Sequence, residues 1–210
     1  MCGGCWNGIT RIEEPWCPSC GAPYRSEAAL SHSPSHRCGL CRDDPPAFTM
    51  AISAGVYEGV LADAIRRLKY HKQVRLARAL SALLDPVLER VPPVDAVMPV
   101  PLHPARLRER EFNQSLHFAA WVSRRLHRPL LLDALRRIRE TAPQITLDRN
   151  QRRKNVRRAF MVRNPRTIAG RRVILVDDVY TTGATVNECA GVLRAAGASA
   201  VYVVTVARML

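Results

Sequence analysis

Long apolar runs are missing from this sequence of 210 residues. No stretch of about 18 apolar residues without charge occurs, which argues against a membrane-spanning helix. The first residues also lack a basic region followed by an apolar run, so no secretory signal peptide is expected. Both absences make a cytoplasmic protein the expectation. Aromatic residues are few, at 6%, but the hydrophobic fraction of 47% predicts a folded domain and not a disordered chain.

Acidic residues are scarce as well. The chain has 18 Asp and Glu against 32 Lys and Arg, a formal net charge of +14. Residues 136–172 hold thirteen basic side chains but only Glu140 and Asp148, a surplus of eleven positive charges. This concentration indicates an anionic partner, either a polyphosphate or a nucleic acid, although a solvated basic loop would have the same composition.

Six of the seven cysteines form three C-x-x-C pairs within the first 41 residues. In a cytosolic protein this spacing favours metal binding over disulfides. Residues 1–46 are rich in Cys, Pro, Gly and Ser and are too few to fold around a core of their own. We therefore expect a Cys-rich module at 1–46 and an α/β domain at 47–210.

The spacing of the cysteine pairs predicts a structural zinc site. Cys17-x-x-Cys20 and Cys38-x-x-Cys41 are separated by seventeen residues, as in zinc ribbons, and four thiolates suit closed tetrahedral zinc. A competing set combines Cys2, Cys5, Cys17 and Cys20. His32 and His36 lie between the later pairs and are alternative ligands, whereas Cys189 is expected to be a buried apolar residue.

From residue 48 onward the pattern alternates between strands and helices. Strands are expected at 48–57, 95–100, 173–176 and 200–206, with a further one at 130–132, and helices at 59–70, 76–91, 113–126 and 188–196. Residues 139–160 have little apolar pattern and predict an exposed loop. The alternation predicts a parallel sheet covered by helices.

The most informative stretch is residues 173–185, VILVDDVYTTGAT. An apolar strand leads to Asp177 and Asp178, and a loop rich in Thr and Gly then precedes a helix. This order places the loop at the carboxyl end of a parallel strand, where open α/β sheets bind ligands. Loop amides, Thr hydroxyls and the helix N-terminus predict a phosphate cradle, with the two carboxylates available for sugar hydroxyls or Mg²⁺. A helix cap after a core strand would need only one Thr and one Asp.

This stretch resembles the phosphoribosyl pyrophosphate (PRPP) motif of type I phosphoribosyltransferases. The resemblance implies that Asp177 and Asp178 bind the ribose hydroxyls and act as the catalytic pair, and that Thr181–Thr185 bind the 5′-phosphate. The implied PRPP-binding residues are Asp177, Asp178, Val179, Tyr180, Thr181, Thr182, Gly183, Ala184 and Thr185.

Three further segments resemble the ComF family, which has this fold and an N-terminal zinc ribbon. They are MPVPLH at 98–103 followed by RLREREFNQ at 106–114, R-x-T-x-x-Q-x-x-L at 139–147 followed by Arg152, Asn155 and Phe160, and LKY at 68–70. The resemblance covers essentially the whole chain. It implies a competence-associated protein that acts in DNA uptake or processing or in nucleotide metabolism, with competence-machinery proteins as partners.

The same resemblance suggests residues for the pyrophosphate side and for a lid over the site. They are His103, Arg106, Arg110, Arg139, Gln144 and Arg152, with residues 139–160 as the lid and 48–70 as a hood over the acceptor. Glu111 stands where the family commonly has Gly, and a carboxylate there would repel pyrophosphate unless Arg108 or Arg110 pairs with it.

Two functions are compatible with these features. One is an enzyme that transfers phosphoribosyl from PRPP with Mg²⁺, by positioning and electrostatics and without a protein nucleophile. The other is a non-catalytic protein that senses PRPP or binds single-stranded DNA or other nucleic acid. The sequence shows no motif for recognising an acceptor.

Overall fold

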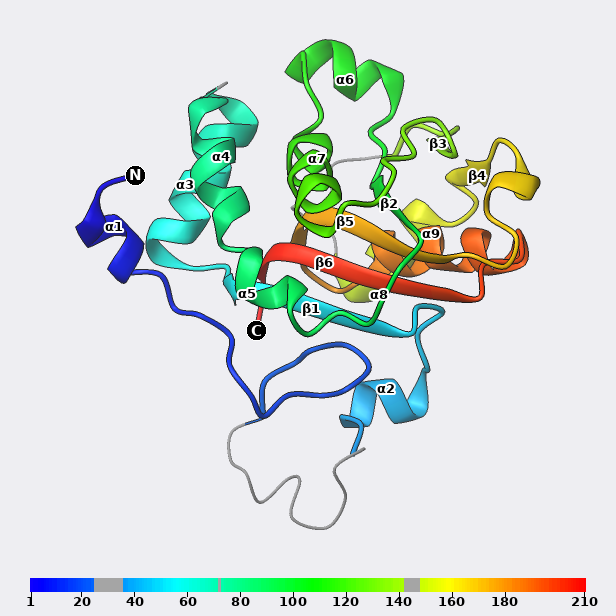
Figure 1. The fold of residues 1–210 in the computed structure, drawn as a ribbon, viewed down its shortest axis with the longest axis horizontal. Coiled ribbons are helices and arrows are strands. Elements are labelled where there is room, and N and C mark those ends of the chain that lie inside the picture. The colour runs from blue at the N-terminus through cyan, green and yellow to red at the C-terminus, as the bar shows by residue number, and fades with distance from the viewer. Residues whose placement is uncertain (25–35, 72, 142–147) are drawn as a thin grey trace.

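The computed structural model describes residues 1–24, 36–71, 73–141 and 148–210 (Figure 1). Two short helices, α1 (Gly3–Asn7) and α2 (Gly39–Asp43), belong to the Cys-rich segment at 1–46, which we call the head. The following elements are β1 (Met50–Val56), α3 (Gly59–Tyr70), α4 (Arg75–Ala82), α5 (Asp85–Leu88), β2 (Ala96–Pro99), α6 (Pro104–Arg110) and α7 (Gln114–Leu126). The remaining elements are β3 (Leu135–Arg137), α8 (Arg149–Val156), β4 (Phe160–Val162), the 3₁₀ turn η3 (Pro165–Thr167), β5 (Arg172–Tyr180), α9 (Ala184–Ala195) and β6 (Ala200–Arg208).

Four strands form one parallel sheet in the order β1-β6-β5-β2. The central strands β5 and β6 are rich in β-branched residues and are buried on both faces, as expected for a parallel sheet. Their register places Asp177 opposite Thr205 and Tyr180 opposite Arg208. The prediction of an α/β fold with a parallel sheet covered by helices is confirmed.

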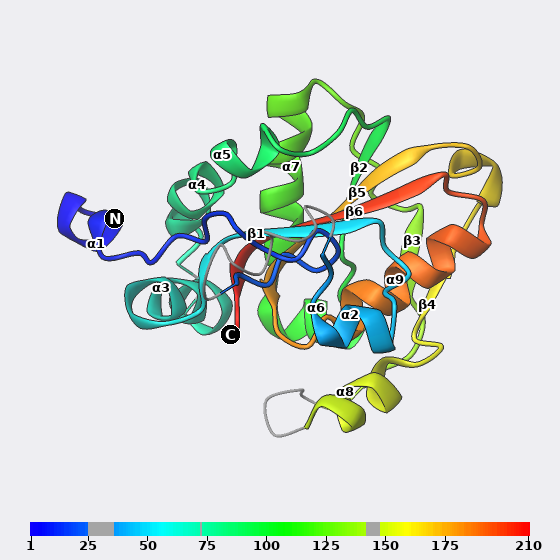
Figure 2. The ribbon, with the colours of Figure 1, turned by 90° about the horizontal axis from the view of Figure 1, so that it is seen from below.

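Each face of the sheet has its own core. Alternate residues of the strands pack with α3, α4, α5 and α7 on one face, where Phe118 is fully buried. The residues between them pack with α9, with the β3–β4 hairpin and with the cysteines of the head on the other. Figure 2 shows the sheet nearly edge-on, with α4 and α5 on one side and α9 and α2 on the other. Cys189 lies in the second core and is buried, as predicted.

Several predicted elements differ from the structure. The helix expected at 188–196 begins four residues earlier, at Ala184. The helix expected at 76–91 is two helices, because Pro86 lacks the N–H that would continue α4 and its ring would clash with the carbonyl four residues earlier. The strand expected to end at residue 176 continues to Tyr180, since Asp177 still pairs with β6. The strand expected at 130–132 is only a single bridge between Leu130 and Val97.

The prediction of a continuous exposed loop at 139–160 is wrong in its second half. Helix α8 begins there because Asp148 and Gln151 form a reciprocal capping box, with each side chain accepting a hydrogen bond from the other residue's backbone N–H at 2.8 and 2.9 Å. This Asp-x-x-Gln signal was present in the sequence. It places α8, and with it Arg152, beside the carboxyl ends of the strands.

The head lies along the edge strand β1. The N–H of Ala51 donates to the carbonyl of Ser19 at 2.8 Å, and Arg11 forms an antiparallel bridge with Gly55. Gly21, at φ +69°, touches the backbone of Ala51 so closely that a Cβ would collide with its carbonyl oxygen. The head therefore pairs with an edge that a bare sheet would expose.

Candidate functional site

A cavity of about 430 Å³ opens at the carboxyl ends of the parallel strands. Residues from α3, the β2–α6 connection, α7, β3 and the loop after β5 line it. They include Lys69, Arg106, Arg110, Gln114, Ser115, Arg137, Thr141, Arg152, Asp177, Asp178, Thr181, Gly183 and Thr185. Segments from residue 57 to residue 209 thus meet around one space, at the place where parallel sheets bind ligands.

Asp177 and Asp178 form the floor of this cavity. Asp177 accepts hydrogen bonds from the Ser115 hydroxyl at 2.8 Å and from the backbone N–H of Asp178 at 2.9 Å. Burial raises the pKa of Asp177 to about 7, and the charge of Asp178 adds to the rise. The Asp177 carboxyl is therefore poised to exchange a proton near neutral pH.

Lys69, on α3, forms an ion pair with Asp178 at 2.8 Å. Burial opposes the charge on the Lys69 ammonium, but its pKa lies above the usual value because Asp178 and then Asp177 attract that charge. In the sequence, Lys69 stands out only as part of the LKY segment that resembles the ComF family. A single lysine on an amphipathic helix gives no sign of its partner more than 100 residues away.

Arg137, on β3, is a second cation that the sequence prediction missed. It donates to the Thr141 hydroxyl, and its guanidinium lies 5.4 Å from the Phe160 ring centroid. Among the residues that the structure describes, its buried Nε has no hydrogen-bond partner, and burial lowers the pKa of this guanidinium. In the sequence it was one of thirteen basic residues in its segment, with nothing to set it apart.

The Thr181–Thr185 loop joins the end of β5 to α9 and includes the first two residues of that helix. The Thr182 hydroxyl accepts a hydrogen bond from the N–H of Ala184 at 3.4 Å, and Gly183 has φ +77°, a conformation that favours glycine. This turn leaves amides of the first turn of α9 beside Thr181 and Thr185 at the cavity wall. The arrangement has the donors that a phosphate needs.

The residues suggested for the pyrophosphate side separate into two groups. Arg106 and Arg110 line the cavity, and Arg110 also lies over the Tyr70 ring at 5.3 Å. His103 is not among the lining residues. Its Nδ1 instead accepts from the N–H of Ala105 and caps α6.

Glu111 has a conformational role that the sequence comparison did not anticipate. It ends α6 in the left-handed region, at φ 66°, where glycine is the usual residue. Glu111 does not line the cavity. The glycine of the family pattern at this position is therefore explained by a helix end and does not require contact with a ligand.

The lid residues also differ in where they lie. Arg152 lines the cavity, whereas Arg139 donates to the backbone carbonyls of Asn155 and Arg157 at 2.8 and 2.7 Å and so holds the end of α8. Gln144 lies outside the described residues.

In the head, the thiols of Cys17, Cys20, Cys38 and Cys41 lie within 4.8 Å of one another. Cys2 is the N-cap residue of α1 and Cys5 lies within this helix, and neither joins the group. His36 packs its ring against Tyr24 instead. His32 lies outside the described residues. The structure thus brings together the ligand set that includes both later pairs.

The four thiols fit a tetrahedral metal ion. The Cys20 and Cys38 sulfurs are 3.7 Å apart. A tetrahedral site with Zn–S bonds of about 2.3 Å has sulfurs roughly 3.8 Å apart. A hydrogen bond from the Cys20 thiol lowers the pKa of Cys17 to about 3, against the effect of burial, and the backbone N–H of Cys38 contributes at 3.4 Å. The cluster could therefore bind a metal such as zinc.

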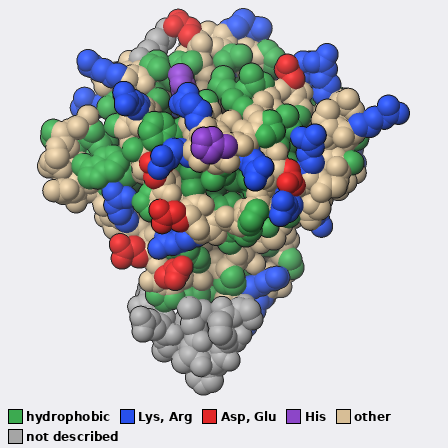
Figure 3. All heavy atoms as spheres, in the orientation of Figure 1, with side chains coloured by type: hydrophobic (Ala, Val, Ile, Leu, Met, Phe, Trp, Pro, Cys, Tyr) green, Lys and Arg blue, Asp and Glu red, His purple; other side chains and the backbone are tan. Residues whose placement is uncertain are grey.

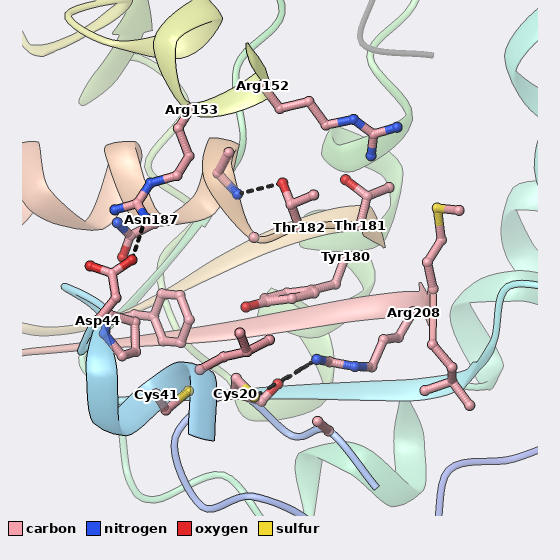
Figure 4. Close-up of a pocket in the computed structure, with 18 of the residues that line it drawn as sticks. Cys20, Cys41, Asp44, Arg152, Arg153, Tyr180, Thr181, Thr182, Asn187 and Arg208 are labelled. Carbon is pink, nitrogen blue, oxygen red and sulfur yellow. Dashed lines mark hydrogen bonds and ion pairs between the residues drawn. The ribbon is translucent and has the colours of Figure 1, made fainter. Parts of the chain in front are cut away.

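A second cavity, of about 660 Å³, lies between the head and the Thr181–Thr185 loop (Figure 4). Arg152 and Arg153 reach it from α8, and Arg153 forms an ion pair with Asp44 at the end of α2. The side chains of Tyr180 and Arg208 lie across from them, between the loop and Cys20. The loop is thus a wall common to both cavities.

Comparison with known proteins finds one matching domain family and several relatives that align with nearly the whole chain. Residues 113–209 match the phosphoribosyl transferase domain. The chain is 36% identical over 220 residues to the DNA utilization protein YhgH of Escherichia coli K12, covering 100% of this chain and 91% of that protein. It is 32% identical over 217 residues to competence protein F of Haemophilus influenzae, covering 99% and 90%.

Among solved structures, the chain resembles glutamine phosphoribosylpyrophosphate amidotransferase from B. subtilis. The TM-score is 0.44 with 22% identity, over 62% of this chain and 26% of that one. No helix within the described residues is both long and apolar enough to cross a membrane.

The cysteine geometry makes a first testable prediction. Purified protein should contain close to one zinc per chain, and Cys38→Ser should lose it because a tetrahedral site needs all four thiolates. Cys2→Ser is the matched control and should keep its zinc. Elemental analysis that found zinc kept in Cys38→Ser but lost in Cys2→Ser would support the competing ligand set.

The raised pKa of Asp177 leads to a second testable prediction, on how stability depends on pH. Since an unfolded Asp has a pKa of about 3.9, the contribution of Asp177 to the stability of the folded protein falls as pH rises from about 4 to about 7 and the buried carboxyl ionises. Asn accepts the same hydrogen bonds without a charge, so Asp177→Asn should raise the melting temperature at pH 8 and raise it progressively less toward pH 4.

The control for this measurement is Asp95→Asn. Hydrogen bonds from Arg172 lower the pKa of Asp95 to about 2, so removing that carboxylate should not stabilise the protein at pH 8. Equal melting-temperature changes for Asp177→Asn at pH 8 and at pH 4 would contradict the assignment.

Proposed function

Because the chain belongs to the ComF family of competence and DNA-utilization proteins, we propose that it binds PRPP in the cavity at the ends of its parallel strands. The observation that carries the proposal is the order strand, carboxylate pair, Thr/Gly loop and helix, opening into a space lined by basic residues. The YhgH and competence names of its relatives support a role in the use of incoming DNA.

In this proposal Asp177 and Asp178 accept hydrogen bonds from the ribose hydroxyls. Lys69 already neutralises Asp178, and Ser115 orients Asp177. Two carboxylates that are already held in place lose little freedom when the sugar binds. The Thr181–Thr185 loop and the first amides of α9 then bind the 5′-phosphate.

The diphosphate would lie toward Arg106 and Arg110, on the far side of the carboxylate pair. Lys69 and Arg137 add positive charge to the same cavity. Carboxylate oxygens are ligands that Mg²⁺ prefers, and the raised pKa of Asp177 indicates that this site favours additional positive charge. Mg²⁺ bound with PRPP would neutralise part of the diphosphate charge.

We propose further that the protein transfers the phosphoribosyl group. The bond from ribose C1 to the diphosphate oxygen breaks, a bond from C1 to the acceptor forms, and the cations of the cavity stabilise the departing diphosphate. Arg152 and α8 would exclude water from the site. Tyr57, Arg66 and Tyr70 line the cavity from the predicted hood and are the residues placed to meet an acceptor.

A PRPP-binding measurement tests the carboxylate pair. Calorimetry with Mg²⁺ should show binding to the wild type, weakened at least about tenfold in Asp177→Asn/Asp178→Asn, since hydrogen bonds to charged groups contribute roughly 1.5–3 kcal/mol. Asp133→Asn removes a carboxylate that pairs only at the surface and should bind normally.

Unchanged affinity in the double variant would remove the assignment of the ribose site. A separate assay distinguishes a phosphoribosyltransferase from a non-catalytic PRPP sensor. It measures the release of diphosphate from PRPP in the presence of a panel of nitrogenous bases. Binding without release for every base would favour a PRPP sensor.

A second candidate function, binding of single-stranded nucleic acid, rests on the basic segment at 136–172. Part of that charge has internal partners: Arg153 pairs with Asp44, Arg172 pairs with Asp95, and Arg139 holds α8. Basic side chains on the face in Figure 3 are scattered among apolar ones and do not form one stripe. Both observations favour weak, mainly electrostatic binding.

The salt dependence of oligonucleotide binding tests this second function. In fluorescence anisotropy, log K against log[salt] should fall with a slope of about −0.7 for each phosphate neutralised on a single strand. Saturating PRPP distinguishes the two uses of the basic residues. Loss of oligonucleotide binding with PRPP means that they share one site, and simultaneous binding means a separate surface. An absence of binding at low salt would eliminate this function.

A further inference from the structure

Arg208 is a buried cation at the junction of the head and the sheet. It is the last residue of β6 and is 8% exposed. Its guanidinium donates to the carbonyl oxygen of Cys20 at 2.5 Å and lies 3.7 Å from the Cys20 sulfur. In the described part of the chain no carboxylate forms an ion pair with it, and its Nε has no hydrogen-bond partner.

A buried cation without a carboxylate needs another source of negative charge. The four-cysteine cluster supplies one, because four thiolates around a divalent metal leave a net negative charge on the sulfurs. N–H groups that point at metal-bound ligands stabilise that charge and orient the ligands. Arg208 is thus placed to interact with the metal-loaded head more favourably than with neutral thiols.

The other side of Arg208 contacts the aromatic ring of Tyr180. This residue leads into the Thr181–Thr185 loop that is proposed to bind phosphate, which we call the phosphate loop. The guanidinium lies 4.4 Å from the ring centroid of Tyr180, its neighbour across the β5–β6 pairing. Tyr180 is 7% exposed and immediately precedes the loop. Its hydroxyl lies beneath Gly183, so that a Cβ at residue 183 would collide with the hydroxyl and the ring.

Tyr180 is therefore enclosed on two sides. Arg208 supports its ring from the side of the cysteines (Figure 4). Gly183 lies against its hydroxyl end. Phe48 meets the ring edge-on, with centroids 6.3 Å apart, and limits its movement further. A shift of Arg208 would change the support under the loop, because packed side chains leave few alternative positions.

We propose that Arg208 is a positioning residue that couples the metal-binding head to the phosphate loop, so that a metal on the four cysteines and a phosphate ligand on the loop strengthen each other's binding. The coupling to PRPP rests on the function proposed above. By thermodynamic linkage the effect is reciprocal: if the metal-loaded head favours the ligand-ready loop, the bound ligand must raise the affinity of the four cysteines for the metal by the same factor.

The equilibrium affinity for zinc measures this coupling directly. Zinc-loaded protein is titrated to equilibrium with a competing colorimetric chelator, with and without saturating Mg²⁺–PRPP. Coupling of typical size would raise the zinc affinity at least about fivefold when PRPP is bound. In Arg208→Met the zinc affinity should be lower and PRPP should no longer raise it, because both the N–H donors and the stacked cation are gone.

Two further variants make the comparison specific. Arg172→Met removes an arginine that is paired with a carboxylate, at the end of β5 opposite Tyr180, and should keep the full effect of PRPP. Arg208→Lys keeps the charge but loses the planar guanidinium, so it should weaken the coupling and serves if Arg208→Met does not fold. Full coupling in the Arg208 variant that folds, or a wild-type zinc affinity that bound PRPP leaves unchanged, would overturn the proposal.

A measurement without PRPP separates this inference from the proposed function. Hydrogen–deuterium exchange of the Thr181–Thr185 amides is compared before and after zinc removal, in wild type and in Arg172→Met. Faster exchange in the loop after zinc loss would support the coupling even if the protein failed to bind PRPP. Unchanged exchange in the loop, together with the expected increase around the cysteines, would refute it.

Discussion

Two carboxylates withdrawn from water determine how the side chains around them are arranged. Asp177 and Asp178 follow each other in a central strand, so neither can move away from the other's charge. Lys69 on α3 and Ser115 on α7 come to this point and contact them directly. Three segments are thus tied to one place in the sheet, and the raised pKa of Asp177 shows that the compensation is incomplete. Such residual cost is typical of sites kept for a ligand.

The head depends on the sheet as much as the sheet depends on the head. Its four cysteines contribute to the second core, and its backbone pairs with β1. The N–H of Ala47, just after the predicted division at residue 46, donates to the Asn187 side chain at 2.7 Å, and Arg153 joins α8 to Asp44. The division at residue 46 stays a prediction, and these contacts show why the segment does not need a large core of its own.

Local chemistry made the parallel sheet, the carboxylate pair and the Thr/Gly loop predictable, since each lies within a short continuous stretch. The cysteine cluster was predictable for the same reason, although spacing alone left two ligand sets open. Lys69 and Arg137 were not assigned to the site, because their roles depend on partners that are distant in sequence. The split at Pro86 and the cap at Asp148 had local signals that the apolar pattern outweighed. Arg106, Arg110 and Arg152 line the cavity, whereas His103 and Arg139 stabilise helices instead, and no side-chain pattern in the sequence separates these two uses.

The register of β5 against β6 has a consequence for how this chain can change over evolution. Asp177 faces Thr205 and Tyr180 faces Arg208, so the same pairing aligns the ligand-side residues with the contact to the cysteines. Residues added to the turn between α9 and β6 would lengthen a connection and leave both alignments intact. A single residue inserted within either strand would move one partner of each pair on one side of the insertion to the opposite face of the sheet. The interior of these two strands therefore sets a fixed length that the surrounding loops do not.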